Sequence, residues 1–134
     1  MYTDLNMNAE SVLPRFAVVE DDPSVARLIQ YMLSDRHGQV ECFALGADLL
    51  KSEHLSQFQT ILLDLSLPDI DGFELMDLLA ARYIGLSILI ISGHADATLR
   101  AAQIYGKGAG LNVRGVLCKP FSKADLLNML GLDA

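Results

Sequence analysis

Short apolar runs and longer amphipathic stretches alternate along the chain. The apolar runs cover residues 15–19, 40–43, 60–64, 86–91 and 115–118, and the fourth, LSILII, is apolar almost throughout. Short apolar runs that end at charges or turn residues are typical of strands buried on both faces. We therefore predict five strands, of which residues 40–43 form the weakest.

Between these runs, apolar residues recur at the spacing of an amphipathic helix. The first helix begins where Asp22 is a good N-cap residue and Pro23 a good first helical residue, and residues 35–38 end it. Ser122, followed three residues later by Asp125, has the spacing of a capping box and opens the last helix. The pattern also predicts helices over residues 47–55, 73–83 and 95–105, and a turn over the glycine-rich residues 106–112.

Strands that alternate with helices form right-handed crossovers, which build a mostly parallel sheet with helices on both faces. The sequence contains no internal repeat, low-complexity tract or linker, and 134 residues suit one domain. We predict a doubly wound α/β domain over residues 14–134, preceded by a loose polar tail over residues 1–13.

Composition and charge narrow the class of protein. Hydrophobic residues make up 51% of the chain, enough for a core, and the formal net charge is −7. This charge disfavours nucleic acid or an anionic membrane surface as the partner, because both attract clustered Lys and Arg. No stretch is long and apolar enough to span a bilayer, and the N-terminus lacks the pattern of a signal peptide. We expect a soluble cytoplasmic protein whose two cysteines, Cys42 and Cys118, are buried reduced thiols.

The segment ILLDLSLPDIDG, residues 61–72, runs from an apolar strand straight into Asp64. An ionised carboxylate is costly to bury unless a cation accompanies it. In an open α/β sheet, the carboxyl ends of the strands line one crevice, so residues at those ends meet even when they are far apart in sequence. The ends of the predicted strands carry Glu20 and Asp21, Asp64, Ser92, and Lys119.

The charges in this crevice predict a metal ion. Three carboxylates carry about −3, and Lys119 offsets about +1, which leaves a deficit that one divalent cation matches; oxygen ligands favour Mg²⁺. A carboxylate, a hydroxyl, an ammonium and a metal are the groups that phosphoryl transfer needs. Asp69 and Asp71 lie near this crevice, and we assign them to the turn around Pro68.

Four motifs in this order, VVEDDP, ILLDLSLPDIDG, ILIISGH and VLCKPF, resemble the receiver domain of two-component response regulators, chemotaxis regulators among them. The resemblance runs from about residue 15 to about residue 130. It implies a flavodoxin-like (βα)5 fold whose parallel strands lie in the order 2-1-3-4-5. It also implies a signalling protein rather than an enzyme, since a receiver catalyses only its own phosphorylation and dephosphorylation.

The same resemblance implies a role for each residue of the crevice. Asp64 matches the phosphoacceptor, which receives a phosphoryl group from a histidine kinase or a histidine phosphotransfer protein. Ser92 and Lys119 match the hydroxyl and the ammonium that hold the bound phosphoryl group. Output would pass to a downstream protein or output domain that the sequence does not identify, and no cofactor other than Mg²⁺ is implied. The family's Mg²⁺ ligands match Glu20, Asp21, Asp64 and the backbone carbonyl of Ser66.

Several positions depart from the family or vary within it. Glu20 stands where some relatives carry Asp, which should leave metal binding intact. Val116 stands three residues before the strand-end lysine, where receivers carry Tyr or Phe, and its short, stiff side chain cannot move a ring in and out. Residues 106–115 are longer and richer in glycine than the usual connection, so we expect an altered output surface there. His94 lies two residues past Ser92, where the family tunes phosphate lifetime, and we interpret it as a surface histidine.

Two other functions stay open at this stage. A pseudo-receiver would use the same fold as a constitutive interaction module; Val116 favours it, whereas the complete set of acids, hydroxyl and lysine argues against it. A flavodoxin-like cofactor binder or small hydrolase would need a glycine-rich phosphate loop after the first strand, where acids stand instead. The chain ends shortly after the last predicted helix, so we expect a stand-alone receiver or one excised from a longer protein.

Overall fold

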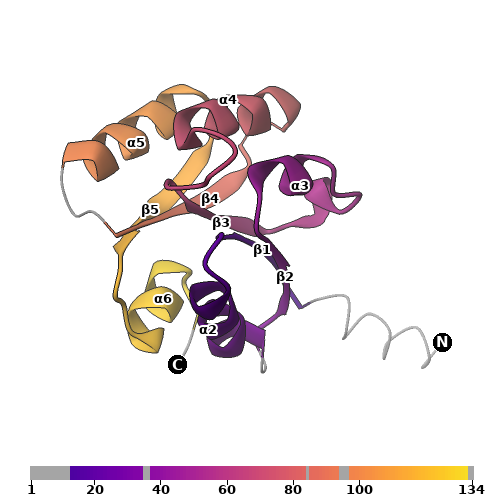
Figure 1. The fold of residues 1–134 in the computed structure, drawn as a ribbon, viewed down its shortest axis with the longest axis vertical. Coiled ribbons are helices and arrows are strands. Elements are labelled where there is room, and N and C mark those ends of the chain that lie inside the picture. Colours follow the sequence, from indigo (N-terminus) through magenta and orange to yellow (C-terminus); the bar gives the residue numbers. More distant parts are fainter. Residues whose placement is uncertain (1–12, 35–36, 84, 94–96, 133–134) are drawn as a thin grey trace.

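A five-stranded parallel sheet with the order β2-β1-β3-β4-β5 forms the centre of the protein (Figure 1). The structure is a computed structural model that describes residues 13–34, 37–83, 85–93 and 97–132. The observed order confirms the flavodoxin-like topology predicted from the sequence. Within the described residues the elements are β1 (Arg15–Val19), α2 (Pro23–Ser34), β2 (Gln39–Phe43), α3 (Gly46–Leu50), the 3-10 helix η1 (Leu55–Gln57), β3 (Thr60–Asp64), α4 (Gly72–Arg82), β4 (Ser87–Ser92), α5 (Ala97–Gly108), β5 (Asn112–Cys118) and α6 (Lys123–Met129).

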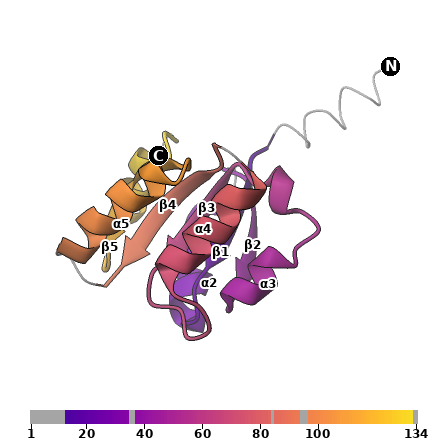
Figure 2. The ribbon, with the colours of Figure 1, turned by 90° about the horizontal axis from the view of Figure 1, so that it is seen from above.

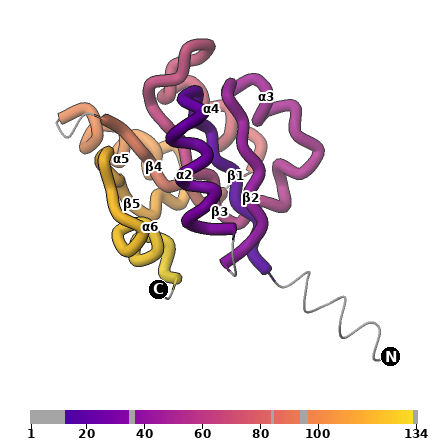
Figure 3. The backbone as a smooth tube through the Cα atoms, turned by 60° about the horizontal axis from the view of Figure 1, so that its bottom comes forward, coloured from indigo at the N-terminus to yellow at the C-terminus, as the bar shows by residue number. Residues whose placement is uncertain are grey.

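Helices cover both faces of the sheet. Figure 2 shows α3, α4 and α5 over one face, and the backbone trace in Figure 3 shows α2 and α6 over the other. In β1, Phe16 and Val18 belong to the core on the α2–α6 side, whereas Ala17 and Val19 belong to the core on the other side. Because the central strands bury both sets of alternating side chains, they show as continuous apolar runs in the sequence.

Side-chain caps fix where three helices begin. The Asp22 carboxylate accepts a hydrogen bond from the Ser24 amide at 2.9 Å, at the start of α2. Asp71 caps α4 in the same way at 2.7 Å. At the start of α6, Ser122 and Asp125 form the predicted capping box. Each cap satisfies amide groups that the first turn of a helix leaves without an intrahelical partner.

The predicted helix over residues 47–55 is wrong in its extent. The helix α3 ends at Leu50, and η1 follows as a separate short element. Leu49 and Leu55 are both buried, but six positions along a helix rotate a side chain by about 240°. A continuous helix could bury only one of these two leucines, so the break after Leu50 allows both to reach the core.

The predicted turn over residues 106–112 is also wrong, because α5 continues to Gly108. Gly106 is buried and serves as a point of close helix–sheet contact. A Cβ added there would lie 2.8 Å from Val113 Cγ2 and 3.2 Å from Met76 Sδ. Glycine was therefore misleading as a turn signal, because here it permits close packing of α5.

The real turn between α5 and β5 is short. It comprises Ala109 and Gly110, and Gly110 has a φ of +102°, which suits glycine. The strand β5 starts at Asn112, earlier than the predicted residues 115–118. A bulge at Arg114 interrupts its pairing with β4, so the pattern of the strand is irregular on this side. The long glycine-rich connection that we expected on this face is therefore absent from the described chain.

Some predictions fall outside the part of the chain that the structure describes. His94 and nearly all of the tail over residues 1–13 are among them, so the domain boundary after residue 13 stays a prediction. Within the described ranges, no helix has both the length and the apolar character needed to cross a membrane. The cytoplasmic location also stays a prediction.

Candidate functional site

Neighbouring strands end at one edge of the sheet and bring the candidate residues together. Pairing of β3 with β4 sets Asp64 opposite Ile91, and pairing of β4 with β5 sets Ser92 opposite Cys118. The Lys119 amide donates a hydrogen bond to the Ser92 carbonyl at 2.8 Å. The residues at this edge are Glu20 directly after β1, Asp64 at the end of β3, Ser92 at the end of β4 and Lys119 directly after β5.

The Lys119 ammonium joins two buried carboxylates. Its Nζ atom lies 2.6 Å from Glu20 Oε1 and 3.1 Å from Asp64 Oδ2. Glu20 is 4% exposed and Asp64 is 3% exposed. Both carboxylates are thus removed from water, while one ammonium neutralises only one of them. The buried edge keeps an excess of negative charge that favours a further cation.

A third carboxylate completes the acidic cluster. Carboxylate oxygens of Glu20, Asp21 and Asp64 lie within 4.8 Å of one another, with Asp21 exposed to solvent. Glu20 Oε1 is buried and, despite its close ammonium, accepts no hydrogen bond of acceptable geometry from the described residues. A buried oxygen with unused lone pairs and two further carboxylates form the all-oxygen donor set that Mg²⁺ prefers. The residues present therefore fit a magnesium ion.

The loop after β3 orients the Asp64 carboxylate from its other side. The Ser66 amide donates a hydrogen bond to Asp64 Oδ1 at 2.9 Å, and the Leu65 amide donates to the Ile91 carbonyl at 3.2 Å. One oxygen of Asp64 is therefore held by a backbone amide and the other by Lys119. Two partners in fixed positions restrict the rotation of this carboxylate.

The electrostatics of the cluster shift two pKa values. Burial raises the pKa of Glu20 from 4.5 to about 6; the close Lys119 ammonium opposes this rise, and the neighbouring Asp64 carboxyl adds to it. Burial lowers the pKa of Lys119, but its contacts with Glu20 and Asp64 outweigh burial and raise the pKa above its usual value. Lys119 therefore stays charged, and Glu20 is the acid whose protonation responds to pH near neutrality.

Ser92 and Gly93 form the end of β4 at this edge. Ser92 is 3% exposed, and the next residue, Gly93, is exposed. A Cβ added at Gly93 would meet no heavy atom within 4 Å. Among the described residues, nothing therefore crowds Gly93 beside the strand end.

An aromatic side chain that the sequence analysis missed lies on α5. Val116, at the expected aromatic position, is half-buried and packs against the core on the α3–α4–α5 side. On the same face, Tyr105 donates its hydroxyl hydrogen to the Asp77 carboxylate of α4, at 2.8 and 2.7 Å from its two oxygens. The Tyr105 ring also packs edge-on against Phe73, at a centroid distance of 5.2 Å. No spacing rule signals this link, because its partners belong to different helices.

We predicted that Asp69 serves only the turn around Pro68, but its carboxylate contacts α3. Its Oδ1 accepts a hydrogen bond from the Gly46 amide at 3.1 Å, and its Oδ2 accepts one from the Ala47 amide at 3.0 Å. These two amides, with the amide of Ala47 as the larger influence, lower the pKa of Asp69. Asp69 therefore connects the loop after Asp64 to the first turn of α3.

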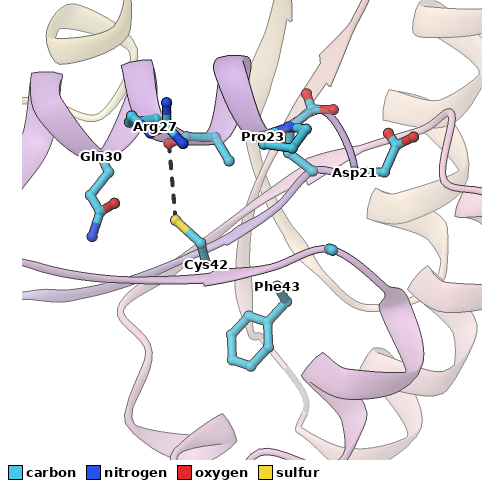
Figure 4. Close-up of a pocket in the computed structure, with 9 residues that line it drawn as sticks. Asp21, Pro23, Arg27, Gln30, Cys42 and Phe43 are labelled. Carbon is cyan, nitrogen blue, oxygen red and sulfur yellow. Dashed lines mark hydrogen bonds between the residues drawn. The ribbon is translucent and has the colours of Figure 1, made fainter.

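A pocket of about 300 Å³ opens beside the acid pair, between α2 and β2 (Figure 4). Asp21 and Arg27 line it, together with Cys42, whose thiol faces the Ala26 carbonyl at 3.9 Å. Cys42 is exposed, so the prediction of a buried thiol is wrong there, because β2 is an edge strand with side chains open to solvent. Cys118 is half-buried.

Known proteins are similar to this chain in sequence and in fold. The family described as "Response regulator receiver domain" matches residues 16–131. The cell cycle response regulator CtrA of Brucella ovis is 32% identical over 113 residues, which cover 84% of this chain and 47% of CtrA. The chain thus spans about half of the length of these relatives.

Solved structures agree with the family match. The non-phosphorylated receiver domain of HemR from Leptospira biflexa is 26% identical, with a TM-score of 0.75 over 88% of this chain and 91% of that one. The chemotaxis protein CheY4 of Vibrio cholerae is 25% identical, with a TM-score of 0.73 over 90% and 98% of the two chains. With its strand order, its acidic cluster and a family match over most of its length, the chain belongs to the receiver domains of two-component response regulators.

Proposed function

We propose that Asp64 accepts a phosphoryl group from a phosphohistidine on a histidine kinase or a histidine phosphotransfer protein. A carboxylate oxygen of Asp64 forms a bond to phosphorus while the bond from phosphorus to the donor imidazole nitrogen breaks. The electron pair of that bond stays on the imidazole nitrogen, which takes up a proton from solvent. The product is an aspartyl phosphate on this chain and a free histidine on the donor.

The observation that carries this proposal is the contact of the Lys119 ammonium, 3.1 Å from Asp64 Oδ2. A buried carboxylate with a fixed cation beside it and a second oxygen held by the Ser66 amide is oriented before the donor arrives. Positioning and electrostatic stabilisation supply most of the rate acceleration in phosphoryl transfer, since the enzyme contributes little covalent chemistry. After transfer, Lys119 and Ser92 would hold oxygens of the bound phosphoryl group.

The metal site follows from the same cluster. Glu20, Asp21, Asp64 and the carbonyl of Ser66 would hold Mg²⁺. When bound, the ion neutralises charge on the oxygens of the transferring phosphoryl group. Glu20 contributes a buried oxygen with free lone pairs, and Asp21 contributes an exposed carboxylate that an ion can reach from solvent.

Output would consist of a change in protein contacts. A bound phosphoryl group adds charge and acceptor oxygens next to Ser92 and Lys119, and it shifts the equilibrium between two arrangements of the surface. The chain would catalyse only its own phosphorylation and dephosphorylation, in the cytoplasm. Its downstream partner would be a protein or an output domain, with no direct contact to nucleic acid or membrane.

The direct test is the intact mass of the protein after incubation with acetyl phosphate and Mg²⁺. We expect one added phosphoryl group in the wild-type protein, none in Asp64→Asn, and none when EDTA removes the metal. Asp48→Asn, which changes an exposed acid on α3, serves as the control and should match the wild type. Uptake that persists in Asp64→Asn would show that the acceptor is another residue.

A pseudo-receiver is the alternative, and Val116 is the observation that favours it, because no ring is available at this position to couple the site to the surface. This function requires that Mg²⁺ fails to bind and that no phosphoryl group is taken up. Partner affinity would then be the same with and without phosphodonor. Mg²⁺ binding with a measurable adduct would exclude it.

A further inference from the structure

The loop of residues 65–71, between Asp64 and α4, is fastened to a distant part of the chain. Its residue Asp69 accepts hydrogen bonds from the amides of Gly46 and Ala47 at the start of α3. The first amides of a helix have no intrahelical partner. A carboxylate that accepts from two of them makes charge-assisted bonds, which are stronger than bonds between neutral groups. The loop and α3 are therefore joined although more than twenty residues separate them in sequence.

A second contact presses the same loop against the same turn. A Cβ added at Gly46 would lie only 2.4 Å from Ile70 Cγ2 and 3.6 Å from Leu67 Cδ1. Ile70 and Leu67 are both half-buried and pack against the core on the α3–α4–α5 side. The loop can approach α3 this closely only because residue 46 has no side chain. Two hydrogen bonds and an apolar contact thus hold the loop against the same turn.

Asp69 lies close in sequence to Asp64, the candidate phosphoacceptor. Only Leu67 and Pro68 separate Asp69 from Ser66, and the ring of Pro68 fixes one of the backbone dihedrals between them. The Ser66 amide in turn donates to Asp64 Oδ1 at 2.9 Å. Because this connecting segment is short, we expect a displacement of Asp69 to move Ser66 relative to Asp64.

We propose that Asp69 is a positioning residue for the phosphoacceptor site, which holds the loop to α3 and thereby places the backbone of Ser66 beside Asp64. Asp69 itself does not touch the reacting atoms. The inference rests on the proposed function of Asp64, because it assigns Ser66 to the machinery of that site. The two amides also lower the pKa of Asp69, so the ionised form that makes the stronger contact prevails at neutral pH.

The competing explanation is that Asp69 only caps α3 and has no effect on the site. The two explanations predict different properties for variants of Asp69. A cap stabilises the protein, so its loss lowers the thermal midpoint and leaves the folded site as it was. A positioning residue also changes the environment of Ser66 and the affinity for Mg²⁺ at temperatures where every variant is folded. Amide hydrogen exchange of Ser66 reports on the first property and Mg²⁺ titration on the second.

The test compares Asp69→Ala, Asp69→Asn and Gly46→Ala with the wild type. The matched control is Asp48→Ala, which removes an exposed acid of α3. In Asp69→Ala we expect about tenfold faster exchange at the Ser66 amide and about tenfold weaker Mg²⁺ binding, since small displacements of positioning groups have effects of this order. Asp69→Asn keeps one acceptor oxygen and should recover part of both properties. Gly46→Ala leaves the carboxylate in place but pushes Ile70, and it should reproduce the defect.

Each arm has a decisive outcome. The inference is overturned if Asp69→Ala lowers the thermal midpoint while Ser66 exchange and Mg²⁺ affinity stay equal to those of Asp48→Ala. If Asp69→Ala does not fold, the Asp69→Asn and Gly46→Ala variants decide by the same two readouts. If the wild type takes up no phosphoryl group from acetyl phosphate, the proposed function fails, and the Ser66 exchange rates still decide whether Asp69 positions the loop.

Discussion

Lys119 places its ammonium 2.6 Å from the buried Glu20 Oε1. The same ammonium reaches Asp64 Oδ2 at 3.1 Å. The lysine partly neutralises two buried acids in the metal-free protein, and under the proposed function it would also hold an oxygen of the phosphoryl group. The stability of the fold and the chemistry of the site depend on the same contact.

Lys119→Met should destabilise the metal-free protein at neutral pH. The change leaves Glu20 and Asp64 buried without their counter-charge, and we expect a loss of about 2 kcal/mol in the free energy of unfolding. Urea denaturation in EDTA measures this loss. Lys123→Met, at an exposed position of α6, should change the free energy by less than about 0.5 kcal/mol. Equal losses in both variants would contradict the role of the buried contact.

The stability of the metal-free protein should rise as the pH falls from about 7 to about 5. The folded protein holds the Glu20 proton with a pKa of about 6, against 4.5 for an ordinary solvated glutamate, so the folded state binds more protons in this window and acid stabilises it. This contribution is complete below pH 4.5 and is lost as the pH rises through about 6. The shift corresponds to at most about 2 kcal/mol.

Urea denaturation in EDTA at about pH 5 and about pH 7 measures the effect of Glu20. The Glu20→Gln variant carries no titrating group and should show a flatter profile over this range. Saturating Mg²⁺ should remove the rise in the wild type, since the ion favours the ionised acid. Asp69, whose pKa is lowered, titrates below this window and leaves the sign unchanged. A wild-type profile that falls toward pH 5 would contradict the assignment.

The candidate site could be predicted from the sequence because its signals are local. Glu20, Asp64 and Lys119 each follow or end an apolar run, and the topology of a parallel sheet brings such ends together without any knowledge of side-chain packing. The strand order was likewise accessible from the four motifs. These signals predict at which edge of the sheet the acids and the lysine gather, and the structure brings them together there.

The side-chain contacts between distant elements could not be predicted in this way. Asp69 stands in a segment that satisfies every rule for a turn, and its partner Gly46 is a glycine more than twenty residues away. The link from Tyr105 to Asp77 joins two helices whose relative position only the packing decides. Each of these contacts depends on the distance between two elements, and a pattern along one chain segment carries no record of that distance.

Gly106 looked like a turn residue in the sequence but lies in α5 against the sheet. Substitution of this glycine provides a quantitative test of that contact. A Cβ at Gly106 would lie 2.8 Å from Val113 Cγ2, whereas a Cβ at Gly108 would meet nothing within 4 Å. We expect Gly106→Ala to lower the free energy of unfolding by about 1–3 kcal/mol through overpacking, despite the better helix propensity of alanine. Gly108→Ala, in the same helix, should be neutral or stabilise the protein by up to about 1 kcal/mol. Stabilisation by both substitutions would mean that α5 moves away from the sheet at little cost.

The hydroxyl of Tyr105 should titrate above the usual range of tyrosine. Its hydrogen bond to Asp77 is the main cause of the raised pKa, since ionisation of the phenol would remove the donated hydrogen and place two negative charges side by side. The ultraviolet difference titration between the wild type and Tyr105→Phe isolates this group from the other tyrosines. In Asp77→Asn the carboxylate charge is gone, so the midpoint should return toward the ordinary value. An unchanged midpoint in Asp77→Asn would show that the helices α4 and α5 are not joined by this contact in solution.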